Sequence, residues 1–102
     1  MLLTPQDKSQ IKRDVVMALR HESEIRKIVI FGSFTTSDTP NDIDIAIFQD
    51  SNEKYLPLAL KYRRLLRSAI ADIPADVVPV RPNPLPSAFL DEILKGETLY
   101  EH

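Results

Sequence analysis

The chain has 102 residues, of which 43% are hydrophobic and 27% are charged, enough for one core and therefore for a single domain over residues 1–102. A formal net charge of −2 argues against nucleic-acid binding, and the absence of cysteine excludes disulfides and thiolate metal sites. No window approaches the roughly 18 apolar residues of a membrane span, and the first residues do not resemble a secretory signal. We therefore expect a cytoplasmic protein that does not contact a membrane.

The N-terminal part of the chain predicts a helix and then a buried strand. Thr4 is placed to cap the helix, and Pro5 suits its first position. Apolar residues at four-residue spacing continue the helix to about residue 21: Ile11, Val15 and Leu19. The apolar run 28–31 then predicts a strand that is buried on both faces and ends at Gly32.

A loop and a second strand follow. Residues 33–41 are rich in Ser, Thr, Asp, Pro and Asn, which predicts a loop with a short helical turn at its start. The stretch "NDIDIAIFQD" then predicts a strand in which Asp42 and Asp44 lie on one face, because side chains alternate along a strand. Ala46 and Phe48 share that face, and the opposite face carries three isoleucines: Ile43, Ile45 and Ile47.

Another helix and strand are expected next. Residues 55–73 carry the apolar spacing of a long helix, which tolerates Pro57 only in its first turn. Residues 75–80, "ADVVPV", predict a strand, and Pro79 indicates that it lies at or near a sheet edge or ends early.

The C-terminal part predicts a stiff connector over residues 81–86, a short helix over residues 87–95 closed by Gly96, and an extended piece over residues 97–101. The apolar residues of the short helix are expected to point inward: Phe89, Leu90, Ile93 and Leu94. The order of elements predicts an α/β (α+β) fold, a small mixed β-sheet with flanking helices.

The aspartate pair is the main sign of chemistry in this sequence. Two residues apart on a strand, the carboxylates of Asp42 and Asp44 project about 6–7 Å apart and can close onto one cation or onto two. Burying two like charges is costly without such a partner, and hard oxygen ligands select Mg²⁺ or Mn²⁺. The alternative is that both carboxylates are merely solvated where the strand leaves a loop.

Gly32 and Ser33 supply a complementary anion site. Glycine lets the backbone approach a ligand, and the N–H groups of a following helical turn, together with the Ser33 hydroxyl, can bind phosphate. Thr35 and Thr36 could add hydroxyl donors, or be ordinary loop residues. A paired-aspartate strand beside such a turn indicates metal-assisted phosphoryl or nucleotidyl transfer.

These motifs, in their order and spacing, resemble those of the DNA polymerase β-like nucleotidyltransferases, in particular the minimal nucleotidyltransferase (MNT) group. The resemblance runs from about Val29 to Glu101 and rests on four features: Gly32-Ser33, Asp42-Ile43-Asp44, a later aspartate in "ADVVPV", and the tail "FLDEILKGETLYE". It implies the polymerase β-like nucleotidyltransferase fold.

The resemblance also implies a role for each site residue. Asp42 and Asp44 would hold two Mg²⁺ or Mn²⁺ ions that bridge the triphosphate of ATP or another NTP, and Gly32 and Ser33 would bind its β- and γ-phosphates. Asp76 would complete the catalytic and metal-binding carboxylates and help to activate the attacking hydroxyl. Alternation along its strand agrees with this role, although Asp76 could also simply mark the start of the strand.

By the same resemblance, the reaction would be a two-metal in-line displacement that moves AMP from ATP to a protein hydroxyl. Such small members commonly act as the antitoxin of a HEPN-domain toxin, which would be the protein partner. The loop after Gly-Ser is shorter here than in many members, and lacks their second Gly and their basic residue. That departure favours the alternative function, a binding module that neutralises its partner by steric contact with a weakened catalytic site.

Overall fold

The computed structural model describes residues 2–81 and 87–102, so most of the predicted connector 81–86 and the Phe89 side chain lie outside the described part. The helices are α1 (Pro5–Leu19), α2 (Ser33–Thr36), α3 (Tyr55–Ala69) and α4 (Ser87–Leu94), and the strands are β1 (Ile25–Phe31), β2 (Ile43–Gln49), β3 (Ala75–Val80) and β4 (Glu97–Glu101). Each predicted element is present, and the α/β prediction is confirmed.

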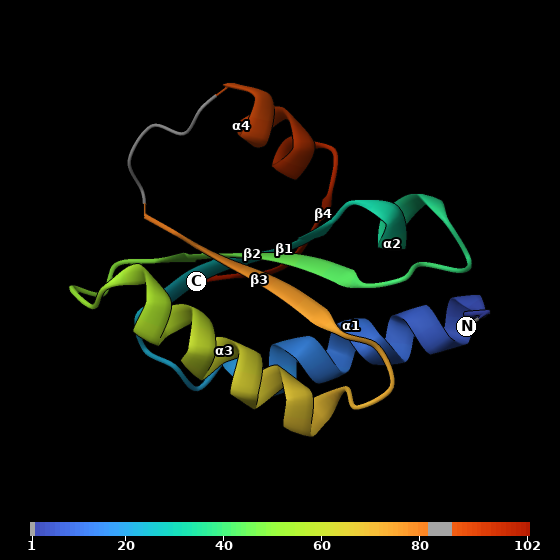
Figure 1. Ribbon diagram of the computed structural model, residues 1–102, viewed down its shortest axis with the longest axis horizontal. Coiled ribbons are helices and arrows are strands. Elements are labelled where there is room, and N and C mark those ends of the chain that lie inside the picture. Colours follow the sequence, from blue (N-terminus) through green and yellow to red (C-terminus); the bar gives the residue numbers. More distant parts are fainter. Residues whose placement is uncertain (1, 82–86) are drawn as a thin grey trace.

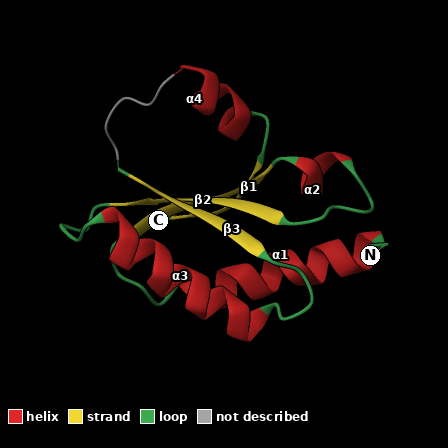
Figure 2. Ribbon diagram, in the orientation of Figure 1, coloured by secondary structure: helices red, strands yellow, loops and turns green. Residues whose placement is uncertain are grey.

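The four strands form one mixed sheet in the order β3-β2-β1-β4. Strand β1 pairs antiparallel with β2 and β4, whereas β2 and β3 are parallel because α3 carries the chain back between them. Helices α1 and α3 lie on one side of the sheet and α4 lies on the other (Figure 1). The short α2 stands at the end of β1, beside the sheet (Figure 2).

Helix α1 begins as predicted, with a reciprocal cap at its first turn. The Thr4 hydroxyl accepts a hydrogen bond from the Asp7 N–H, and the Asp7 carboxylate accepts one from the Thr4 N–H, which satisfies two end donors of the helix. The helix ends at Leu19, two residues before the predicted end. Its three buried residues are those of the predicted stripe: Ile11, Val15 and Leu19.

The alternation predicted for β2 is confirmed. Its three isoleucines are fully buried in the main core, between the sheet and helices α1 and α3. Ala46 lies in a second, smaller core on the opposite face, with Val29, Phe31, Val80 and Ile93. Asp44, two residues before Ala46 on β2, and Asp42, just before the strand, therefore face the side of the sheet on which α4 packs.

Strand β3 is an edge strand, as Pro79 predicted. Pro79 stays within the strand and is buried opposite Ile47, so the strand does not end early. Helix α3 includes Pro57 in its first turn, as expected, but ends at Ala69 rather than near residue 73. Ile73 still enters the core from the connection that follows.

The C-terminal helix differs in two respects from the prediction. Ile93 is buried, but Leu90 and Leu94 are 37% and 68% exposed, because a helix lying alone on a sheet face buries only one stripe. Gly96 follows the helix without the positive φ of a left-handed cap. Glycine is required at this position because the backbone is crowded there: an added Cβ would overlap the carbonyl oxygen of Ile30.

Among the described residues, no helix is long and apolar enough to cross a membrane.

Candidate active site

Three aspartates from two neighbouring strands converge at one end of the sheet. Asp42 immediately precedes β2, Asp44 is its second residue, and Asp76 is the second residue of β3. The parallel register pairs Asp44 with Asp76, and one carboxylate oxygen from each aspartate lies within 4.8 Å of those from the other two. The sequence-predicted trio is thus brought together as a triad.

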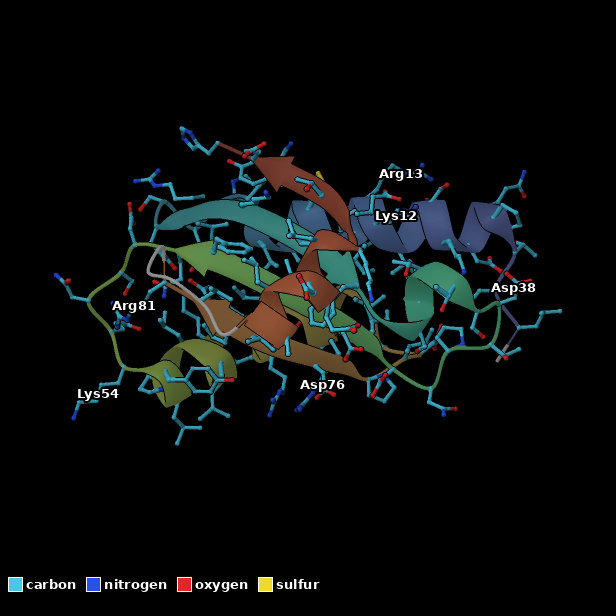
Figure 3. All side chains as sticks on the ribbon, turned by 90° about the horizontal axis from the view of Figure 1, so that it is seen from above. Lys12, Arg13, Asp38, Lys54, Asp76 and Arg81 are labelled. Atoms are coloured by element: carbon cyan, nitrogen blue, oxygen red, sulfur yellow. The ribbon has the colours of Figure 1, made fainter. Side chains whose placement is uncertain are left out.

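The triad differs in exposure from one member to the next. Asp42 and Asp44 are partly buried, whereas Asp76 is exposed on the edge strand. Figure 3, which looks down on the α4 side of the sheet, shows Asp76 on β3 at the margin of the molecule. Asp76 is therefore accessible from the open edge of the sheet, because no further strand of the described chain lies beside β3.

Electrostatics make the triad a suitable cation site. Burial raises the pKa of Asp44 above its ordinary value, and the neighbouring charges of Asp42 and Asp76 raise it further. No basic side chain among residues 2–81 and 87–102 forms an ion pair with any of the three. Three crowded carboxylates without a counter-charge fit a hard divalent cation such as Mg²⁺ or Mn²⁺.

Gly32 stands directly against the triad. It has φ +76° and ψ −150°, a backbone conformation that is essentially restricted to glycine. An added Cβ would overlap Oδ2 of Asp44, so the position requires glycine on two independent grounds. The turn that carries Gly32 and Ser33 thereby lies close enough to the carboxylates for one ligand to contact both.

The turn continues as α2, a single helical turn. The Thr35 N–H donates to the Gly32 carbonyl at 3.1 Å, whereas the N–H group of Ser33, at the start of the turn, has no carbonyl partner within the helix. Ser33 and Thr36 are exposed. The Thr35 hydroxyl donates a hydrogen bond to the Gly32 carbonyl at 2.8 Å, so in this structure its proton is used within the turn and not offered to a ligand.

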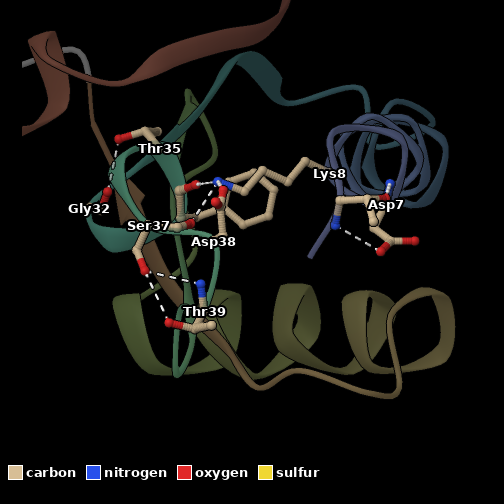
Figure 4. Close-up of polar contacts among 9 residues, drawn as sticks. Asp7, Lys8, Gly32, Thr35, Ser37, Asp38 and Thr39 are labelled. Atoms are coloured by element: carbon tan, nitrogen blue, oxygen red, sulfur yellow. Dashed lines mark hydrogen bonds and ion pairs between the residues drawn. The ribbon is translucent and has the colours of Figure 1, made fainter. Parts of the chain in front are cut away.

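A lysine distant in sequence holds this loop. Lys8 of α1 donates from Nζ to the carbonyl oxygens of Phe34 at 2.7 Å and Ser37 at 2.6 Å, and lies 3.8 Å from the Asp38 carboxylate (Figure 4). Sequence reasoning noted that the loop lacks a basic residue of its own. It missed Lys8, because nothing in the sequence pairs two positions 26 residues apart.

Lys8 is one of three lysines around a neighbouring cavity of about 390 Å³. The others are Lys12 and Lys95, and Thr35 also lines the cavity. Lys12 pairs with Glu97 at 2.9 Å, so part of this charge is already compensated.

Comparison with known proteins gives a family match and several similar folds. The family model described as polymerase beta, nucleotidyltransferase matches residues 13–102. No curated protein sequence matches the chain significantly. Several solved structures match the chain, and at their low sequence identities they show a similar fold and no more.

One of these structures is the tri-AMPylated HEPN toxin of Shewanella oneidensis in complex with MNT antitoxin. The matching chain is 20% identical with a TM-score of 0.69, over 93% of this chain and 73% of that one. A chain of a toxin–antitoxin structure with AMP-PNP is 21% identical with a TM-score of 0.70, over 89% and 73%. A chain of the toxin–antitoxin MntA–HepT is 19% identical with a TM-score of 0.67, over 92% and 73%.

Proposed function

Because the chain belongs to the polymerase β nucleotidyltransferase family, we propose that it transfers AMP from ATP to a hydroxyl group of a partner protein. The single observation that carries the proposal is the convergence of Asp42, Asp44 and Asp76 within 4.8 Å, beside a glycine that no other residue can replace without strain. A divalent metal site next to a phosphate-binding turn is the arrangement that such a transfer needs.

In this proposal Asp42, Asp44 and Asp76 hold Mg²⁺, or Mn²⁺, as two ions. Bound divalent ions would neutralise the developing charge and lower the pKa of the attacking hydroxyl. The N–H groups of Gly32 and Ser33 orient the β- and γ-phosphates, as helix N-termini do for anions. The hydroxyls of Thr35 and Thr36 are the further candidate donors, Thr35 after release of its bond to Gly32.

The proposed reaction is a substitution at the α-phosphorus of ATP. The acceptor oxygen forms a bond to that phosphorus, the bond from phosphorus to the oxygen bridging to the β-phosphate breaks, and pyrophosphate leaves. The proton of the hydroxyl passes to Asp76 and then to water. Asp76 suits this role because it is the exposed member of the triad, at the edge where the acceptor arrives.

We propose a HEPN-type toxin as the partner, with this chain as its antitoxin, in the cytoplasm where ATP is available. Support comes from the structures of similar fold, which include a tri-AMPylated HEPN toxin with MNT antitoxin and a toxin–antitoxin structure with AMP-PNP. The domain alone offers little surface to enclose a second substrate, which also favours a macromolecular acceptor.

The test is label transfer from ATP with Mg²⁺ to a co-purified partner. ATP labelled at the α-phosphate should label one protein band, and ATP labelled at the γ-phosphate should not, because pyrophosphate leaves. Asp44→Asn should abolish labelling, while the matched variant Asp91→Asn, an exposed aspartate on α4, should retain it. A stable complex with no label from wild type would replace transfer with neutralisation by steric contact.

A further inference from the structure

A second polar site lies at the start of β3, on the opposite face of the sheet from the triad. Two arginines of α3 and the connection to β3 line a cavity of about 370 Å³. The polar groups that line it belong to Arg63, Arg67 and Asp72, and the rest of the wall is formed by apolar residues. The site described above uses none of these side chains.

Neither arginine forms an ion pair within the described part of the chain. The Nε–H group of Arg63 is buried and has no hydrogen-bond acceptor, which is costly for a buried donor. Arg67 is exposed, and the described residues give it no ion pair. Two guanidinium groups against one carboxylate leave the cavity with a surplus of positive charge.

The position of the cavity connects it to the acceptor. Its wall includes Ala75, the first residue of β3, and the next residue along the strand is Asp76. Successive side chains of a strand point to opposite faces, so the cavity opens on the α3 side while Asp76 faces the α4 side. An acceptor segment that crosses the open edge to reach Asp76 can therefore also contact the two arginines on the α3 side.

We propose that the Arg63–Arg67 cavity binds a carboxylate side chain of the acceptor protein, a few residues from the hydroxyl that receives AMP. Guanidinium groups bind carboxylates through paired, charge-assisted hydrogen bonds, and the exposed Arg67 has no carboxylate partner among the described residues. The inference rests on the proposed function, since it assigns this cavity to the acceptor of that reaction.

The test compares two fluorescent peptides, each with one tyrosine, followed in one by three glutamates and in the other by three glutamines. Binding is measured by fluorescence anisotropy at low ionic strength, because salt screens an exposed charge such as Arg67. Wild type should bind the glutamate peptide about tenfold more tightly. Arg67→Glu should remove that preference, and Arg64→Glu should keep it.

Arg64 is a matched control because it lies on the same helix, is exposed, and does not line the cavity. Both variants change the net charge equally, so a general electrostatic attraction would be weakened in both. Equal loss in the two variants, or equal affinity for the two peptides in wild type, would overturn the proposal. It would also be overturned if Arg67→Glu weakened the binding of Mg-ATP and not of the peptide.

The same peptides separate this proposal from the proposed function. Asp44→Asn should lose Mg-ATP binding and keep the preference for glutamate. If wild type binds no ATP and transfers no label, the transferase assignment fails, and the peptide preference still decides whether the cavity recognises carboxylates.

Discussion

A substitution at Gly32 tests directly whether the conformation of this turn and the position of the Asp44 carboxylate depend on each other. Replacing Gly32 by alanine places a Cβ in a left-handed conformation with φ +76°, and directs it onto Oδ2 of Asp44. The change is small in chemistry and adds one methyl group. Its effects should nevertheless reach both the stability of the chain and the geometry of the triad.

Two costs are expected for Gly32→Ala. A non-glycine residue held in this backbone region costs about 1–3 kcal/mol. The overlapping atom is the end of a side chain, so Asp44 can rotate away, but leaving its preferred rotamer costs roughly 0.5–1.5 kcal/mol. Together these give a loss of about 1.5–4.5 kcal/mol in the free energy of unfolding. In the protein that still folds, the Asp44 carboxylate should be displaced.

A double-mutant cycle separates the two costs. Urea denaturation would be measured for wild type, Gly32→Ala, Asp44→Ala and the double variant. In the Asp44→Ala background the overlap is absent, so Gly32→Ala should cost about 1 kcal/mol less there than in wild type. Thr36→Ala, at an exposed position of α2, serves as the control and should change stability by less than about 0.5 kcal/mol.

Two outcomes would refute this reasoning. A loss below about 0.5 kcal/mol for Gly32→Ala would mean that the turn does not need its left-handed conformation. Equal losses in the two backgrounds would mean that Gly32 and Asp44 are not in contact, and the phosphate-binding turn would then not lie against the triad.

Three further predictions concern single side chains. Without metal, Asp44→Asn should have a higher melting temperature than wild type, because it removes a partly buried charge that lies beside two others. Added Mg²⁺ should raise the melting temperature of wild type and not that of the variant. An equal rise in both proteins would contradict the metal assignment. Tyr62→Phe should cost about 1–3 kcal/mol in urea, since the buried hydroxyl donates to Glu24 at 2.7 Å. Burial, and then Glu24, raise the pKa of Tyr62. The hydroxyl therefore contributes its full stabilisation below about pH 10, and this contribution is lost as the pH rises above that value. Tyr62→Phe should lack this alkaline loss of stability, and parallel curves of unfolding free energy against pH for the two proteins would contradict the prediction. Lys8→Met should cost about 1–2 kcal/mol and speed proteolysis of the following loop, whereas an unchanged cleavage rate would show that Lys8 does not hold it.

Much of the site could be predicted because strand periodicity is a local signal. Alternation alone placed Asp42 and Asp44 on the face opposite the isoleucines, and the same rule indicated that Asp76 could align with them. Pro79 correctly marked an edge strand, because a residue without an N–H group is tolerated there. These inferences needed only neighbouring residues, and the strand order, the register of β2 with β3 and the convergence of the three aspartates confirmed them.

What the sequence did not reveal depends on contacts between distant segments. Lys8 reaches the loop from another helix, and the orphan donor of Arg63 exists only once α3 packs beside β3. Gly96 was predicted as a left-handed helix cap, but it is required because the chain passes close to the backbone of Ile30. Leu94 was expected inside and is exposed, since one helix on a sheet face buries a single stripe.

Because β2 and β3 pair in parallel, the three aspartates come together only when the two strands are in the correct register. Asp44 and Asp76 are direct partners in the register, so a slip of one residue would turn Asp76 to the opposite face and bring Ala75 or Val77 opposite Asp44. Such a misaligned sheet would keep its hydrogen bonds but lose one of its three cation ligands. Any divalent ion that binds all three aspartates would therefore stabilise the native register over its neighbours, and the edge strand would be fixed in place by the same ion that its aspartate helps to hold.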